Sequence, residues 1–134
     1  MQAHLWTALV TLAALTLYVA LGINVGRARY TSGVEAPAVT GDVKLERAFR
    51  VHYNTLEWLA PFLGAMWLFA LYWNDRVAAG IGVVWILGRI VYARSYMADP
   101  AKRGPGFGIQ ALATLVLLLG AIGRVIWLLA NGVA

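Results

Sequence analysis

The sequence contains no cysteine and only two histidines, His4 and His52, among its 134 residues. Without cysteine the chain can form neither disulfides nor thiolate metal sites, and it has no thiol nucleophile of its own. The two histidines fall on different segments, which argues against a haem held by two imidazoles. We therefore expect no metal site in this protein.

Charged residues are also scarce. They make up 13% of the chain, whereas 61% of its residues are hydrophobic and the mean hydropathy is +0.70. A soluble domain carries about 25% charged residues, so this chain has too few polar side chains to cover its surface in water. The formal net charge of +5 gives no reason to expect a nucleic acid as partner. The composition predicts a small integral membrane protein whose surroundings are the lipid bilayer.

Four long apolar runs occur, at 5–25, 55–73, 77–93 and 109–130. Roughly 20 apolar residues suffice for one helix to cross the hydrocarbon core, and no run alternates as a membrane strand does. We predict helices over 5–29, 43–73, 76–98 and 106–131, joined by loops at 31–42, 74–76 and 99–106. The expected fold is all-α: a single domain, 1–134, that forms an integral membrane four-helix up-down bundle.

The basic residues predict the orientation of these helices. Nine of the 11 lie in or beside the loops after the first and third helices, and the positive-inside rule assigns that side to the cytoplasm. Both termini are then outside, and Trp6, Trp73 and Trp127 lie at the outer interface. The stretch 1–6 lacks the basic residues of a signal peptide, so we expect the first helix to be retained.

Polar residues in the second and third predicted helices share faces. At 100° per residue, Arg50, Asn54 and Glu57 fall within a sector of about 60°, and His52 points away from it. In the third helix one face carries a further set of three residues: Arg89, Tyr92 and Tyr96. Each set spans about 10 Å along its helix, so the two faces can meet at one depth. We expect an ion pair between Glu57 and Arg89.

Two interpretations of this polar cluster are open. Ionisable groups within a membrane bundle can simply pin helices together, and an arginine near a helix end can extend to the interface. Together, the polar side chains on the two facing surfaces exceed what pinning requires, which favours a binding cavity. Pro61 cannot donate to the carbonyl of Glu57, so we expect a bend in the helix at that point. Arg124, in the fourth helix, is expected to reach the interface or a partner rather than to take part in chemistry.

The segment RVHYNTLEWLAPF, 50–62, resembles the R-x-H-x-N-x-x-E-x-x-x-P-F signature of the MAPEG family, the membrane-associated proteins in eicosanoid and glutathione metabolism, which include microsomal glutathione transferases. The segment GRIVYARSYMADPAKR, 88–103, resembles the same family's third helix. The resemblance implies a homotrimer with glutathione bound between subunits near the cytosolic face. The implied glutathione-binding residues are Arg50, His52, Asn54, Glu57, Trp58, Arg89, Tyr92 and Tyr96, with His52 reaching the neighbouring subunit's site.

The resemblance also assigns catalytic roles, to Arg103 and Arg27, although alignment does not separate Arg27 from Arg29. Tyr92 and Trp58 differ from the residues of other branches of the family. The implied function is that of a glutathione-dependent transferase, with possible peroxidase activity, acting on hydrophobic electrophiles in a bacterial inner membrane. The alternative is a non-catalytic trimeric binder of lipids or other hydrophobic molecules. A small multidrug exporter is disfavoured because the run 5–25 contains no carboxylate.

Overall fold

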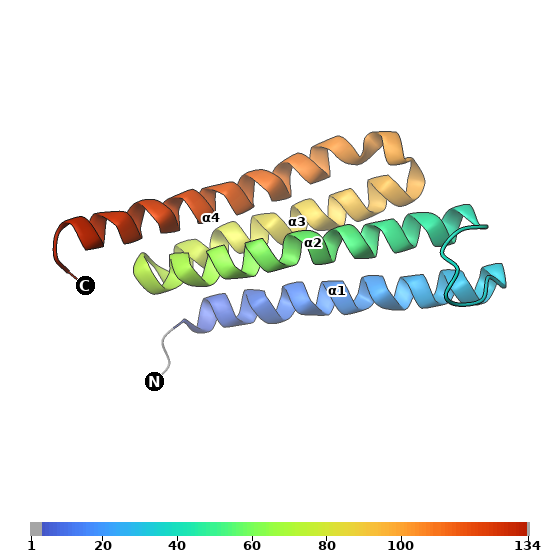
Figure 1. Cartoon of the computed structure of the whole chain (residues 1–134), viewed down its shortest axis with the longest axis horizontal. Helices are drawn as coiled ribbons and strands as arrows, with labels where there is room; N and C mark the ends of the chain where they lie inside the picture. The colour runs from blue at the N-terminus through green and yellow to red at the C-terminus, as the bar shows by residue number, and fades with distance from the viewer. Residues whose placement is uncertain (1–3, 134) are drawn as a thin grey trace.

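Four long helices account for most of residues 4–133, which the computed structural model describes. They are α1 (Leu5–Ser32), α2 (Val43–Tyr72), α3 (Asp75–Ala98) and α4 (Gly104–Ala130), with a short 3-10 helix, η1 (Pro100–Arg103), before α4. Successive helices run in opposite directions, and the chain begins and ends at the same end of the bundle (Figure 1). All four are long and apolar enough to cross a membrane. The predicted all-α, four-helix membrane fold is confirmed.

The helix ends follow local sequence signals. Helix α1 continues beyond the predicted residue 29 and stops at Gly33, whose φ of 71° suits glycine. Helix α2 begins after Asp42, whose carboxylate accepts a hydrogen bond from the backbone of Leu45 at 2.9 Å. Helix α4 begins at Gly104 rather than at the predicted residue 106, since Pro105 lies in its first turn, where proline is tolerated. Residues 1–3, part of both the predicted domain and the signal-peptide argument, lie outside the described residues.

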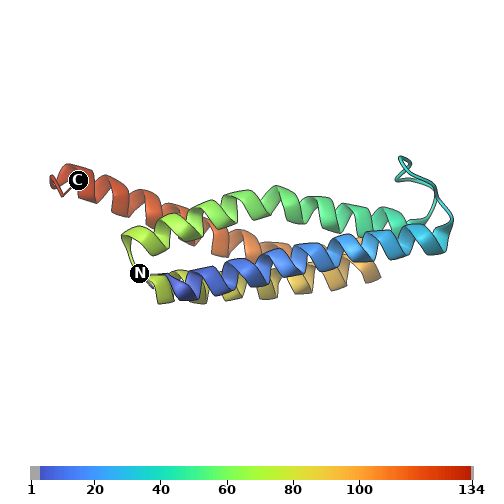
Figure 2. The same cartoon turned by 90° about the horizontal axis from the view of Figure 1, so that it is seen from below.

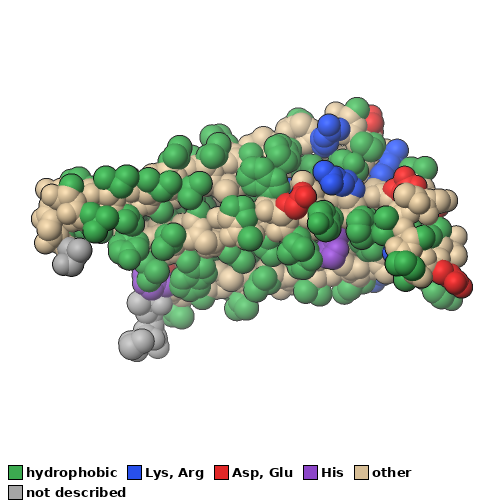
Figure 3. Space-filling view, viewed as in Figure 1, with side chains coloured by type: hydrophobic (Ala, Val, Ile, Leu, Met, Phe, Trp, Pro, Cys, Tyr) green, Lys and Arg blue, Asp and Glu red, His purple; other side chains and the backbone are tan. Residues whose placement is uncertain are grey.

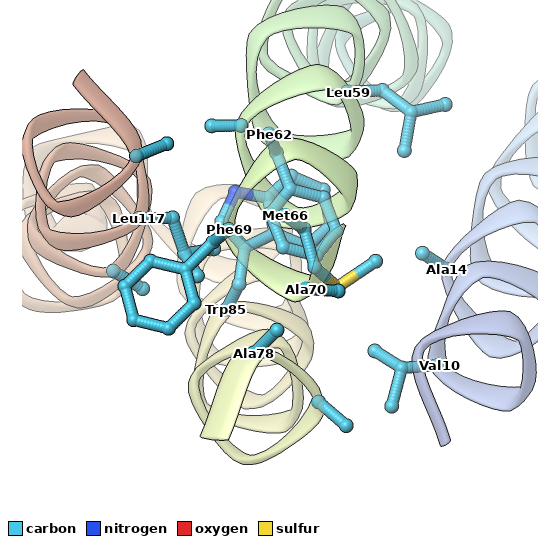
Figure 4. Packing of buried hydrophobic residues seen from close by; sticks show 14 residues of the cluster. Val10, Ala14, Leu59, Phe62, Met66, Phe69, Ala70, Ala78, Trp85 and Leu117 are labelled. Carbon is cyan, nitrogen blue, oxygen red and sulfur yellow. The ribbon is translucent and has the colours of Figure 1, made fainter. Parts of the chain in front are cut away.

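The bundle has two faces around a central pair of helices. Helix α1 packs on α2 and α3, and α4 packs on the same two helices from the other side (Figures 1 and 2). Between them Phe62 and Trp85 stack face to face, with ring centroids 4.1 Å apart. Met66 and Leu117 are fully buried beside this pair (Figure 4). Large aliphatic side chains cover the outside, as expected for helices surrounded by lipid.

Helix α2 passes through Pro61 without a break. Figure 2 shows it curving along its length, in contrast to the straighter α1. The bend that the sequence predicts at Glu57 remains a prediction. Lys and Arg side chains gather at the end of the molecule that carries the α1–α2 loop and η1 (Figure 3). This end is the one that the positive-inside rule assigns to the cytoplasm.

At the opposite end of the bundle, a residue at the start of α3 caps the N-terminus of α1. The carboxylate of Asp75 accepts hydrogen bonds from the backbone N–H groups of Trp6, at 3.1 Å, and Thr7, at 2.9 Å. The first N–H groups of a helix have no partner within it, and a carboxylate there also interacts favourably with the helix dipole. Asn74 caps α3 itself by accepting from the backbone of Arg76 and Val77. The α2–α3 turn therefore fixes the ends of two helices at once.

Glycines allow α3 and α4 to approach closely beside the polar end. A Cβ atom on Gly106 would lie 2.3 Å from the backbone nitrogen of Tyr92 and 2.9 Å from the carbonyl oxygen of Gly88. These are backbone atoms, which cannot rotate away as a flexible side chain would. By contrast, a Cβ atom on Gly108 would meet nothing within 4 Å.

We expect Gly106→Ala and Gly108→Ala to change stability in opposite directions. The first should lower the free energy of unfolding by about 1–3 kcal/mol, because α4 must move away from Tyr92. The second should raise it by about 0.5–1 kcal/mol, because alanine loses less conformational entropy than glycine in a helix. Unfolding in mixed micelles measures both. Equal effects of the two substitutions would contradict the close packing of α3 on α4.

Candidate functional site

A pocket of about 370 Å³ opens between α2, α3 and the start of α4. Its lining consists of Arg50, Asn54, Trp58, Tyr92, Tyr96, Arg103 and Phe107. Six of these seven are residues that the sequence analysis singled out, and the structure brings them together from α2, α3 and η1. Phe107 was missed because it is an apolar residue at the start of an apolar helix, and nothing in its local sequence distinguishes it.

Arg89 lies behind the pocket and is fully buried. Its guanidinium donates to the Asn54 side-chain oxygen at 3.1 Å and to the Thr55 hydroxyl at 2.7 Å. The same group lies over the Tyr92 ring, 4.2 Å from its centroid. Thr55 was also missed, although it directly follows Asn54 in the sequence. Arg89 thus holds one pocket residue from α2 and one from α3 in place.

The prediction of an ion pair between Glu57 and Arg89 is wrong. No ion pair is present in the described part of the chain, and the Asn54 side chain lies between the two residues instead. Its amide nitrogen donates to the Glu57 carboxylate at 3.0 Å, while its oxygen accepts from Arg89. An asparagine side chain carries both a donor and an acceptor. It can therefore lie between a cation and an anion and form a hydrogen bond with each. The Glu57 side chain is exposed on the surface of the bundle.

Aromatic rings form one wall of the pocket. Trp58 and Phe107 meet edge to face, with centroids 5.3 Å apart. Phe107 also lies 6.2 Å from Tyr92, which in turn packs against Tyr96 at 5.6 Å. The pocket therefore presents an apolar surface beside the cationic side chains of Arg50 and Arg103, both of which are exposed. Such a site can hold an anion and an apolar group side by side.

Two arginines at this end of the bundle bind backbone carbonyls. One Arg47 nitrogen donates to the carbonyl oxygens of Met97, at 2.9 Å, and Ala98, at 3.0 Å, and so caps the end of α3. Arg103 donates to the carbonyl of Pro100 at 2.9 Å within η1. Because Arg47 belongs to α2, its two bonds join α2 to α3 beside Tyr96.

Four of the predicted site residues do not line this pocket: Glu57 and Arg89, whose positions are given above, and His52 and Arg27. His52 stacks on Tyr18 of α1, with centroids 4.4 Å apart, and approaches Gly22. Arg27 is exposed near the end of α1. Its neighbour Arg29 binds the carbonyl of Ala38 at 2.6 Å and therefore serves the α1–α2 loop. Arg27 is thus the freer of the two arginines. The catalytic role of Arg27 and the contact of His52 with a neighbouring subunit's site remain predictions.

No group of three or more His, Asp or Glu side chains within residues 4–133 is arranged to hold a metal ion. What the site offers is positive charge from Arg50 and Arg103, a buried third cation in Arg89, and one carboxylate in Glu57. Arginine does not lose its proton in proteins and forms bidentate bonds with carboxylates. The arrangement suits a small molecule that bears carboxylate groups.

Comparisons with known proteins agree with this geometry. The MAPEG family model matches residues 7–123. An uncharacterized protein of Synechocystis is 50% identical over 92% of this chain and 90% of its own length. Human microsomal glutathione S-transferase 2 is 37% identical over 75% of this chain and 69% of its own, and leukotriene C4 synthase of Cavia porcellus is 30% identical over 87% and 78%. This chain is therefore an integral membrane protein that belongs to the MAPEG family.

Proposed function

We propose that this protein is a glutathione-dependent membrane transferase that conjugates hydrophobic electrophiles, with peroxidase activity toward lipid peroxides as a related reaction. The observation that carries the proposal is the pocket in which two exposed arginines adjoin an aromatic wall. The relatives described as microsomal glutathione S-transferase 2 and leukotriene C4 synthase support glutathione use in the family. With no cysteine in the chain, an external thiol also supplies the nucleophile that the protein lacks.

Each part of the site has a proposed role. The carboxylates of glutathione would bind Arg50 and its neighbours by charge-assisted hydrogen bonds, and Glu57 would accept from the ammonium group. A free thiol has a pKa of about 8.5, and a nearby cation such as Arg103 favours the thiolate. The thiolate sulfur would then attack the electrophilic carbon, a C–S bond would form, and the leaving group would depart with the electron pair. Trp58 and Phe107 would pack against the apolar part of the electrophile.

The exposure of Glu57 within a membrane-spanning helix supports assembly into an oligomer. A carboxylate that faces lipid is costly, and such residues usually face protein or a water-filled cavity. A second copy of the chain that covers this surface would remove the cost, and the homotrimer implied by the family resemblance would place it there. We propose that the pocket opens to the cytoplasm of a bacterial cell and that both termini lie outside the inner membrane.

We expect Arg50→Gln to weaken glutathione binding about 10- to 100-fold, since a hydrogen bond to a charged group contributes roughly 1.5–3 kcal/mol. Calorimetry on detergent-solubilised protein measures the affinity. Arg94→Gln, which removes an exposed arginine of α3 outside the pocket lining, is the control and should bind as the wild type does. Absence of binding to the wild type at millimolar glutathione would refute the proposed function.

The alternative, a non-catalytic trimeric binder of hydrophobic molecules, makes a different prediction. It requires a pocket but no activated thiol. The ultraviolet absorbance of a thiolate should appear when glutathione is added to the wild type at neutral pH if the protein is a transferase. Binding of glutathione without that absorbance would favour the binder.

A further inference from the structure

A second cationic feature lies at the opposite end of the bundle, where α2 and α4 end. The Arg124 Nε atom donates to the carbonyl oxygen of Tyr72 at 3.0 Å, within the last turn of α2. The guanidinium contacts two exposed indoles, 4.7 Å from the Trp127 centroid and 5.5 Å from that of Trp73. Trp73 is held in turn by a hydrogen bond from its ring nitrogen to the carbonyl of Gly120 at 2.8 Å. These contacts therefore fix the position of Arg124.

The two terminal nitrogens of this guanidinium form no hydrogen bond with the residues that the structure describes. Within residues 4–133 the only hydrogen bond of the Arg124 side chain is the one made by Nε, and no carboxylate forms an ion pair with it. An arginine fixed through Nε and by ring stacking presents its terminal N–H groups in a preset fork. That fork matches the oxygens of a phosphate group, which it can bind in bidentate fashion.

An apolar groove of about 330 Å³ adjoins this arginine. Its lining residues come from α2 and α4 and are Leu68, Tyr72, Leu118, Ala121, Ile122, Val125 and Ile126. Tyr72 belongs to both features, because its carbonyl binds Arg124 and its side chain lines the groove. Leu118 is six residues before Arg124, about 9 Å along α4 toward the middle of the bundle. The groove therefore runs along the helices, the direction in which acyl chains lie in a bilayer.

From this arrangement we propose that Arg124 and the groove form a binding site for one phospholipid. The phosphate binds the Arg124 guanidinium, the glycerol region lies at the Trp73 and Trp127 rings, and an acyl chain occupies the groove. The order of charge, aromatic ring and apolar surface along the site matches the order of headgroup, interface and chain in a lipid. This site is separate from the glutathione pocket and does not depend on the proposed enzymatic function.

The test is titration of the full-length protein in dodecyl maltoside with dioctanoyl phosphatidylglycerol, with thermal unfolding as the readout. A ligand that binds only the folded state stabilises it by RT ln(1 + L/Kd), where L is the ligand concentration, so the melting temperature rises with the ratio of the lipid concentration to Kd. Arg124→Gln should raise the lipid concentration needed for a given rise in melting temperature about tenfold or more, because it removes the charged donors. Ile122→Trp, which fills the groove and leaves the arginine in place, should have a similar effect. Arg76→Gln removes an exposed arginine at the same end and should titrate as the wild type does.

Two further ligands identify what is recognised. Dioctanoylglycerol, which lacks the phosphate, should stabilise the protein far less than phosphatidylglycerol does, and inorganic phosphate alone should not stabilise it. Similar titrations with dioctanoyl phosphatidylcholine would support recognition of the phosphate itself. The proposal is overturned if dioctanoylglycerol matches phosphatidylglycerol, if inorganic phosphate alone stabilises the protein as well as the lipid does, or if Arg124→Gln and Ile122→Trp both titrate as the wild type does.

Discussion

Arg103→Gln is expected to lower the kcat/KM of glutathione conjugation about 100- to 1000-fold, the usual effect of removing one preorganised electrostatic group from an active site. Arg103 is an exposed residue of η1 that lines the pocket. Its charge would therefore act directly on a thiol bound in the pocket. Glutathione affinity should change much less, because Arg50 and Arg89 remain. Steady-state rates and calorimetric affinities, measured on the same preparation, separate the two effects.

The pH profile provides a sharper test of the Arg103 assignment. A cation lowers the pKa of a neighbouring thiol, so its removal should move the rise in activity to higher pH, toward the ordinary thiol pKa of about 8.5. The defect should therefore be largest near neutral pH and shrink as the pH rises. Lys102→Gln, which removes the adjacent exposed cation outside the pocket, is the matched control. A defect of equal size at every pH would argue against a role for Arg103 in thiol activation.

Arg89→Leu is expected to destabilise the protein by about 2–4 kcal/mol and to abolish measurable glutathione binding. The substitution leaves the Asn54 side-chain oxygen and the Thr55 hydroxyl oxygen without their donor, and each unsatisfied buried group costs roughly 1–3 kcal/mol. Asn54 then loses one of the two bonds that orient it toward Glu57. Unfolding in mixed micelles gives the stability, and calorimetry gives the binding.

Thr55→Val distinguishes a connected network from independent contacts. Alone it should cost about 1.5–3 kcal/mol, because one hydrogen bond to the charged guanidinium is lost. Combined with Arg89→Leu it should add little, because the bond it removes is already absent. Arg94→Leu, at an exposed position on the same helix, should leave both stability and binding unchanged. Additive losses in the double variant would show that Arg89 and Thr55 act separately.

Much of the site could be predicted from the sequence, because the angular spacing of residues along a helix is fixed. That spacing placed Arg50 and Asn54 on one face and His52 on another, and the structure agrees. The hydropathy pattern likewise predicted four helices to within a few residues at most ends. The end of α1 lies three residues beyond the predicted residue 29, and the start of α4 lies two residues before the predicted residue 106.

The remaining details depend on side-chain conformation, which helical spacing does not determine. A shared face and a shared depth suggested that Glu57 would meet Arg89, yet the shorter Asn54 side chain is the one that reaches both. Similarly, the sequence does not show that Arg29, and not Arg27, binds the α1–α2 loop, because this depends on the direction of each side chain. Phe107 joins the pocket only because Gly106 lets α4 approach α3 closely, a relation between distant segments.

The link between Asp75 and the start of α1 has a consequence for the order of assembly. The carboxylate that binds the backbone of Thr7 is 68 residues later in the chain. During synthesis α1 therefore reaches the membrane before its cap exists, and its first N–H groups rely on water at the interface. The cap forms only when the α2–α3 hairpin has inserted and its turn arrives beside α1. The first helix to be made is thus completed only once the third has begun.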